Sequence, residues 1–278
     1  MSESPLWSAS LLTTALEDVH GHRGLQARGT ARELYRDYLA AGAGMVGTLT
    51  YQLSDLALQS SGSTGKYATE QLMEQAMQLA LKGRDEHVAV QTRKALHFTS
   101  RPKPLISLTL GPYGAALANG SEYTGDYGSI SHEQLVAFHR DRLVQASRCE
   151  SFSSIDAIAF ETIPRLDEAE AIFDALEALA NADGMPQSLR PAYISFVFPP
   201  EAGGRLPYTV QGSNPSGVTE ILQLFAARCQ TCRWPVVGIG INCTKPRLMD
   251  RVARELTNAV QGEQTLRQRL FLFVSRSP

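Results

Sequence analysis

Short apolar segments alternate with longer segments of helical periodicity along the chain, and this alternation limits the fold more than any other feature of the sequence. Six segments have the length and the β-branched or apolar content of buried strands. They cover residues 45–51, 105–110, 156–161, 192–198, 236–242 and 270–274. Because helical segments lie between them, they predict parallel strands with crossover helices, which is an α/β fold.

Two of the helical segments carry a capping box, in which Ser or Thr is followed three residues later by Glu or Gln. Thr30 with Glu33 predicts a helix over residues 30–41, and Ser131 with Gln134 predicts the start of another. Apolar residues recur on one face of each segment, so both helices are predicted to pack on the sheet.

Composition narrows the organisation and the class of partner. The chain has 278 residues, 43% of them hydrophobic, and a single domain of about 250 residues is usual for α/β barrels. The formal net charge of -2 gives no field that would attract nucleic acid or an anionic membrane surface. No segment approaches the roughly 20 apolar residues of a membrane span, and a secretory signal pattern is absent. We therefore expect a cytoplasmic protein that binds small molecules.

In parallel α/β folds, binding and catalytic residues gather where the strands end. The mostly polar residues 48–52 lie at the end of the first predicted strand. Residues 160–164, which include Glu161, lie at the end of the third. Cys243 follows the fifth predicted strand directly. A carboxylate and a thiol are therefore predicted at one edge of the sheet.

The long loop after the second strand, residues 111–127, is rich in Gly and Tyr. It is either a surface connection with turn residues or a lid over a site, since long ordered loops often have that role. As a lid it would bring Tyr113, Tyr123 or Asp126 to the rim of the site.

The other three cysteines precede their strands, whereas Cys243 follows one. Cys229 and Cys232 have C-x-x-C spacing ahead of the strand at 236–242, and seven residues at about 3.3 Å each place them about 20 Å or more from Cys243. Cys149 likewise precedes the strand at 156–161. Free cysteine is among the most buried residue types, so these three are interpreted as structural.

Five segments together resemble the homocysteine S-methyltransferase family. They are PLWSA at 5–9, TLTYQ at 48–52, SLTLGPYGAALANGSEYTGDY at 107–127, AFETIPRLDEAEAI at 159–172 and GINC at 240–243. They span nearly the whole chain in the order found in that family.

The resemblance implies a (β/α)8 TIM-barrel-like fold in which zinc holds the thiol of homocysteine as a thiolate. That sulfur would attack the methyl group of a sulfonium donor, S-methylmethionine or S-adenosylmethionine, and give methionine. A free thiol has a pKa near 8.5, which explains the need for a metal at neutral pH. By resemblance, Cys243 is a zinc ligand, Glu161 holds the substrate ammonium group, and Asn242 and Tyr51 line the substrate pocket.

The sequence also departs from the family pattern at both ends. The family places a strand with an Asp-Gly-Gly type segment before the position that matches Met1, and a GGCC segment with two further zinc ligands after an additional strand. We therefore expect a single homocysteine-binding domain over residues 1–278 that forms an incomplete barrel, without the first and last strands. Zinc is expected to bind weakly or not at all.

Two functions stay open at this point. One is a methyltransferase that makes methionine from homocysteine; the other is a catalytically inactive, truncated paralogue that acts as a binding or interaction protein. The sequence predicts no oligomeric state.

Overall fold

A computed structural model describes residues 22–60, 68–94, 102–182, 189–199, 203–208, 216–262, 266 and 270–274. The segment at 5–9 lies outside these residues. All six predicted strands are present. They are β1 (Met45–Gly47), β2 (Leu105–Leu110), β3 (Ala157–Ile163), β4 (Ala192–Phe196), β5 (Val236–Ile241) and β6 (Phe271–Val274).

The chain divides into two compact units, which are described separately. Unit 1 comprises residues 1–109 and 145–158, and unit 2 comprises residues 110–144 and 159–278. Unit 1 holds β1, β2 and the first residues of β3 in that order, and unit 2 holds the rest of β3, then β4, β5 and β6. The pairs β1–β2, β4–β5 and β5–β6 are parallel, which confirms the predicted α/β fold with crossover helices.

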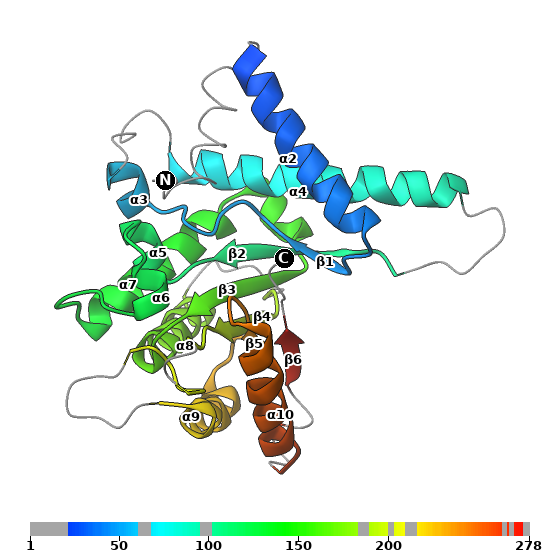
Figure 1. Cartoon of the computed structure of the whole chain (residues 1–278). Coiled ribbons are helices and arrows are strands. Elements are labelled where there is room, and N and C mark those ends of the chain that lie inside the picture. The colour runs from blue at the N-terminus through cyan, green and yellow to red at the C-terminus, as the bar shows by residue number, and fades with distance from the viewer. Residues whose placement is uncertain are drawn as a thin grey trace. The chain divides into compact units, whose positions relative to one another are not determined.

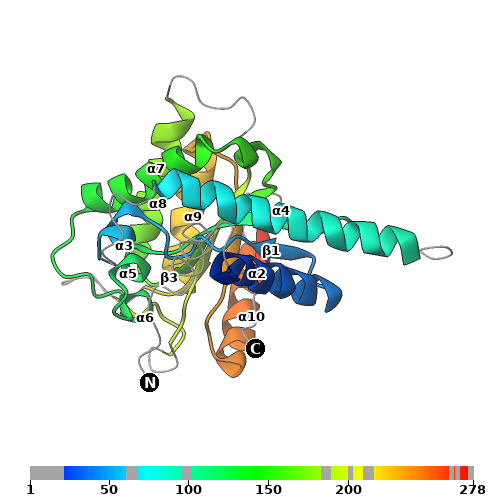
Figure 2. The same ribbon diagram turned by 90° about the horizontal axis from the view of Figure 1, so that it is seen from above.

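In unit 1, α2 (His22–Ala40) packs across the long α4 (Thr69–Lys94) in both views (Figures 1 and 2). The two helices approach closely at Gly83, where an added Cβ would lie 2.8 Å from Cβ of buried Tyr35. The short helices α3 (Asp55–Ser60) and η1 (Glu150–Ser154) complete this unit. Helix α2 begins before Thr30, so the predicted start at that residue is wrong.

In unit 2, α5 (Tyr113–Leu117), α6 (Ser121–Thr124) and α7 (His132–Ser147) precede β3, with the last residues of α7 in unit 1. Helix α8 (Leu166–Ala180) follows β3, and α9 (Val218–Thr231) follows β4. Phe225 of α9 lies edge-on to Phe173 of α8 and to Phe196 of β4, with ring centroids 5.2 and 6.3 Å apart. These aromatic contacts place α8 and α9 on the same side of β4.

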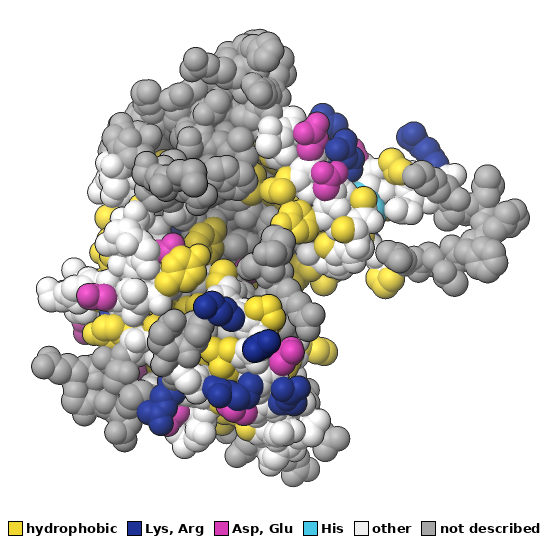
Figure 3. Space-filling model, in the orientation of Figure 1, with side chains coloured by type: hydrophobic (Ala, Val, Ile, Leu, Met, Phe, Trp, Pro, Cys, Tyr) yellow, Lys and Arg dark blue, Asp and Glu magenta, His cyan; other side chains and the backbone are white. Residues whose placement is uncertain are grey.

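Helix α10 (Pro246–Gly262) follows β5 and is strongly amphipathic. Met249, Val252 and Leu256 are buried, while Lys and Arg side chains gather on the outside around this helix (Figure 3). Arg251 and Arg254 are among the exposed residues of α10.

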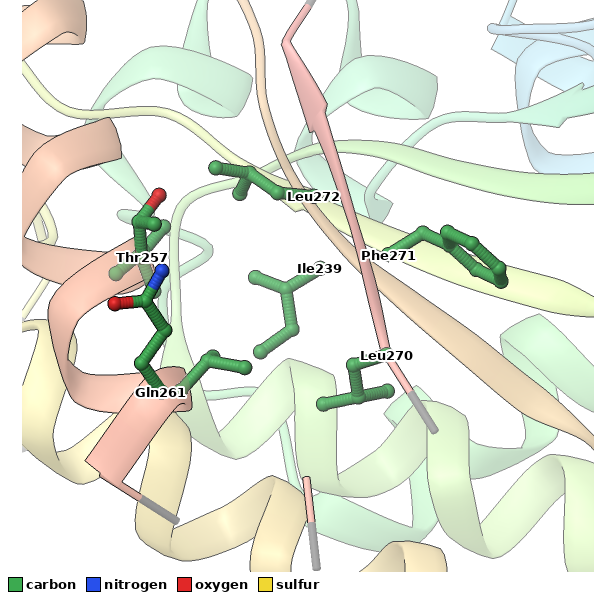
Figure 4. Close-up of a pocket in the computed structure, with 8 residues that line it drawn as sticks. Ile239, Thr257, Gln261, Leu270, Phe271 and Leu272 are labelled. Carbon is green, nitrogen blue, oxygen red and sulfur yellow. The ribbon is translucent and has the colours of Figure 1, made fainter. Parts of the chain in front are cut away.

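A small apolar cavity of about 160 Å³ lies between α10 and β6 (Figure 4). Ile239, Leu256 and Leu272 line it, and Phe271 points to the other side of β6. The lining holds no charged group, so an amino acid would find no ion-pair partner for its ammonium or carboxylate there. No helix within the described residues is long and apolar enough to cross a membrane.

Candidate functional site

Two residues with left-handed backbones meet at the carboxyl ends of β3 and β5. Thr162 has a φ of 66° and Cys243 a φ of 47°, and the Thr162 hydroxyl lies 3.7 Å from the Cys243 Sγ. A β-branched residue in this region costs free energy and is held there only by its surroundings. Such strain concentrates at functional sites, so this meeting point is our candidate site.

The side chain of Asn242 holds the two strand ends together. Its Oδ1 accepts the Thr162 backbone N–H at 3.1 Å, and its Nδ2 donates to the Thr162 hydroxyl at 2.8 Å. The same Nδ2 lies 3.8 Å from the Cys243 Sγ. Only 5% of Asn242 is exposed, so these bonds replace water and fix the geometry of the strained pair.

A second set of bonds ties the end of β5 to the end of β4. The Thr244 hydroxyl accepts the Phe198 N–H at 3.0 Å and donates to the Asn242 carbonyl at 2.9 Å. The segment that carries Cys243 is therefore anchored on both β3 and β4.

Glu161 lies next to Thr162, and the Tyr193 hydroxyl donates to its Oε1 at 2.9 Å. Burial raises the pKa of the Glu161 carboxyl above its ordinary value, and the Tyr193 bond lowers it only in part. A partly buried carboxylate with no cation partner among the described residues is suited to bind an ammonium group, since the ligand charge would offset its desolvation.

The strand β5 runs close beside β4 at Gly240. An added Cβ there would lie 1.8 Å from the Ser195 Oγ, so only glycine fits. Gly240 lies two residues before Asn242, so this close approach of the two strands is near the candidate site in the sequence.

Tyr51, the fourth residue predicted for the pocket, belongs to unit 1 and is partly buried in the turn after β1. Next to it, the hydroxyls of Thr48 and Thr50 lie 2.6 Å apart and bond to the backbone of Thr109. The Thr109 hydroxyl is buried and has no partner among the described residues. The predicted roles of Tyr51, Glu161, Asn242 and Cys243 toward a substrate stay predictions.

The segment 111–127, predicted as a surface connection or a lid, contains α5 and α6. Tyr113 is not at a rim: its ring packs against Tyr127 and Phe138, with centroids 5.5 and 5.2 Å away. Tyr123 is 51% exposed, and its pKa is raised by burial and by the negative charges of Cys243 and Glu122.

Of the remaining cysteines, Cys229 lies at the opposite end of β5 from Cys243. The Cys229 Sγ contacts the carbonyl of Val236, the first residue of β5, and Cys149 is buried against carbonyls of Glu70 and Gln145. Among the described residues no group of three His, Cys, Asp or Glu side chains is placed to hold a metal ion. Sequence reasoning missed Tyr193 and Thr244, because neither lies in a recognisable motif.

The parallel sheet with its crossover helices defines an α/β protein of the barrel type. The thiol and the carboxylate lie at the carboxyl ends of the strands, where such folds have their active sites. The family model described as homocysteine S-methyltransferase matches residues 1–274. The chain belongs to this family.

Individual relatives agree with this family assignment. Homocysteine S-methyltransferase 1 of Brassica oleracea var. italica is 32% identical over 265 residues, 92% of this chain and 67% of that protein. Selenocysteine Se-methyltransferase of the same plant is 31% identical and covers 91% of this chain and 63% of that protein. The crystal structure of the homocysteine methyltransferase MmuM from Escherichia coli, in its oxidized form, matches with a TM-score of 0.65 at 25% identity. The structural match covers 100% of this chain and 86% of the MmuM chain.

The chain is shorter than the relatives it matches. Across eight of these proteins it spans between 55% and 67% of their length. Family membership is therefore established for the matched region, and the activity of the chain is a proposal.

Proposed function

We propose that this chain binds homocysteine and transfers to it a methyl group from a sulfonium donor, S-methylmethionine or S-adenosylmethionine, to give methionine. The observation that carries the proposal is the joining of the β3 and β5 ends, in which Asn242 bonds to Thr162, the neighbour of Glu161, and the Thr162 hydroxyl lies beside the Cys243 sulfur. The match to the family model over residues 1–274 favours this activity over the alternative, an inactive binding protein.

The proposed role of Glu161 is to bind the ammonium group of homocysteine. Because burial raises the pKa of this carboxyl, an arriving ammonium group favours release of the carboxyl proton. Asn242 is occupied by Thr162 through both ends of its amide, so its main contribution is to hold the site together.

The transfer itself balances as a single displacement. The sulfur of homocysteine donates an electron pair to the methyl carbon of the donor, a new S–C bond forms, and the S–C bond of the sulfonium breaks. The bonding pair stays on the donor sulfur, which becomes a neutral thioether, and the thiol proton of homocysteine passes to solvent. Since the thiolate is the nucleophile, the rate should rise with pH toward the thiol pKa, near 8.5.

Cys243 is proposed as one thiolate ligand of a zinc ion. Zinc sites use three or four protein ligands, and Cys243 is the single thiol that the described residues place at the site. This set does not make a complete cage, so no step is assigned to the metal, and we expect weak zinc binding. Elemental analysis of dialysed protein tests this: close to one zinc per chain, lost in Cys243→Ala but kept in Cys229→Ala, would contradict the expectation of weak binding.

Titration calorimetry with homocysteine tests the substrate assignment. Glu161→Gln keeps an acceptor for the Tyr193 hydroxyl but removes the charge, so we expect its Kd for homocysteine to rise at least tenfold. Glu170→Gln on the exposed side of α8 is the matched control and should bind as the unchanged protein does. Equal affinity in Glu161→Gln and the unchanged chain would refute the role of Glu161.

A further inference from the structure

A fully buried carboxylate on the first turn of α8 has no role in the site described above. Glu168 is 0% exposed. Its Oε1 accepts the Tyr113 N–H at 2.6 Å and lies 3.1 Å from the His139 Nε2, and its Oε2 accepts the Tyr127 hydroxyl at 2.6 Å. An ionised carboxylate is costly to bury unless such bonds offset its lost hydration, so this arrangement is specific.

The protonation states of His139 and Tyr127 allow both side chains to donate a hydrogen bond to the Glu168 carboxylate, as the Tyr113 N–H does. Burial lowers the pKa of His139, which keeps the ring neutral and leaves Nε2–H as the donor. Burial and the charge of Glu168 raise the pKa of Tyr127, so its hydroxyl keeps its proton. Both conditions favour donation to the Glu168 oxygens.

The donors come from the two ends of one segment. Tyr113 begins α5 and Tyr127 follows α6, so Glu168 fastens residues 113 and 127 to the first turn of α8. Figure 1 shows α5, α6 and α7 grouped together within unit 2. The chain between the two tyrosines turns at Gly120 and Gly125, which have φ values of 84° and 71°.

Arg165 fastens the same segment near its C-terminal end. Its Nη1 donates to the Gly125 carbonyl at 3.0 Å, and its guanidinium lies 4.8 Å from the Tyr127 ring centroid and 3.8 Å from that of Tyr208. Asp167 pairs with it at 2.6 Å. Arg165 comes three residues after Thr162, whose hydroxyl lies beside the Cys243 sulfur, so the segment and the thiol are anchored on the same stretch of chain.

We propose that Glu168 is a positioning residue, which fixes the segment 111–127 on the stretch of chain that holds Thr162 beside the Cys243 sulfur, where the methyl donor must approach. This inference rests on the proposed function. A sulfonium carries a positive charge, and an aromatic ring face attracts a cation. Holding the segment with its exposed Tyr123 in place therefore favours the donor over a neutral thioether product.

The test compares Glu168→Gln and Tyr127→Phe with Asp174→Asn. Gln offers one acceptor oxygen instead of two, and Phe keeps the ring but lacks the donor, so each loosens the segment without opening a large cavity. Asp174 lies further along α8 and pairs with Arg228 and His132, so its variant weakens a salt bridge on the same helix but leaves the segment fastened.

The first readout does not depend on catalysis. Alkylation of Cys243 by iodoacetamide, followed by mass spectrometry, should be at least threefold faster in Glu168→Gln and Tyr127→Phe than in the unchanged chain. Hydrogen exchange of the amides at 111–127 should speed up in parallel. Asp174→Asn should change neither. Unchanged alkylation and exchange in Glu168→Gln and Tyr127→Phe would overturn the proposal, whether or not the chain transfers methyl groups.

The second readout compares the KM for the methyl donor with the KM for homocysteine, the methyl acceptor. In the transfer assay, both variants should raise the KM for the sulfonium donor at least fivefold and leave the KM for homocysteine unchanged. An equal rise for both substrates would show a merely structural role and refute positioning. If the unchanged chain yields no methionine, the proposed function fails, and the alkylation and exchange results still decide the place of the segment.

Discussion

The Thr162 hydroxyl lies 3.7 Å from the Cys243 sulfur, and both residues have left-handed backbones. Neither conformation is favourable by itself. The bonds that hold the pair come from Asn242, so the geometry of the candidate site should depend on this one amide.

Replacing Asn242 with Ala should lower the free energy of unfolding by about 2–4 kcal/mol, because it removes two hydrogen bonds and leaves the buried Thr162 N–H without its partner. Urea unfolding measures the loss. Asn258→Ala, on the exposed side of α10, is the control and should stay within about 0.5 kcal/mol of the unchanged chain. Equal effects of the two changes would contradict the role given to Asn242.

Glu161 should make stability depend on pH in a defined direction. Its folded pKa is raised by burial, whereas an unfolded Glu titrates near 4.3. The folded chain therefore keeps the proton to higher pH, and stability falls as pH rises through the folded pKa. Glu161→Gln cannot titrate, so its unfolding free energy relative to the unchanged chain should grow as the pH rises from about 4.3 to the folded pKa. A constant difference across this range would show that the carboxyl is not perturbed.

The close approach of β4 and β5 predicts a paired effect. Gly240→Ala should destabilise the chain by about 1–3 kcal/mol through overpacking, because the new methyl group meets the Ser195 Oγ. Ser195→Gly in the same chain should restore most of that loss, which a double-mutant cycle would measure. Gly29→Ala in α2, where nothing lies within 4 Å, should instead stabilise by up to about 1 kcal/mol.

Much of the fold was predictable because buried strands and crossover helices leave strong apolar patterns. Strand β1 ends at Gly47, four residues earlier than predicted, since the Thr48 and Thr50 hydroxyls bond to the Thr109 backbone. Such side-chain bonds compete with regular pairing and leave no clear pattern in the sequence.

Of the two predicted capping boxes, one marks the start of a helix and the other does not. Ser131 and Gln134 form the predicted reciprocal bonds at the start of α7. Thr30 lies inside α2, because good helix formers such as Leu25, Gln26 and Ala27 precede it and a cap is worth only about 1 kcal/mol.

The candidate site was predictable in place but not in detail. Glu161 and Cys243 fall at strand ends, as the pattern of the chain predicted. The left-handed backbones of Thr162 and Cys243 were not predictable, because tertiary contacts rather than residue type hold them. The inward packing of Tyr113 likewise depends on Tyr127 and Phe138, which are distant in sequence.

The most direct test of the account is methionine formation by the purified chain from homocysteine with isotopically labelled S-methylmethionine and, separately, S-adenosylmethionine. We expect labelled methionine with at least one donor, at a rate that rises toward about pH 8.5 and falls at least tenfold in Glu161→Gln. A folded chain that binds homocysteine but gives no labelled methionine with either donor would contradict it.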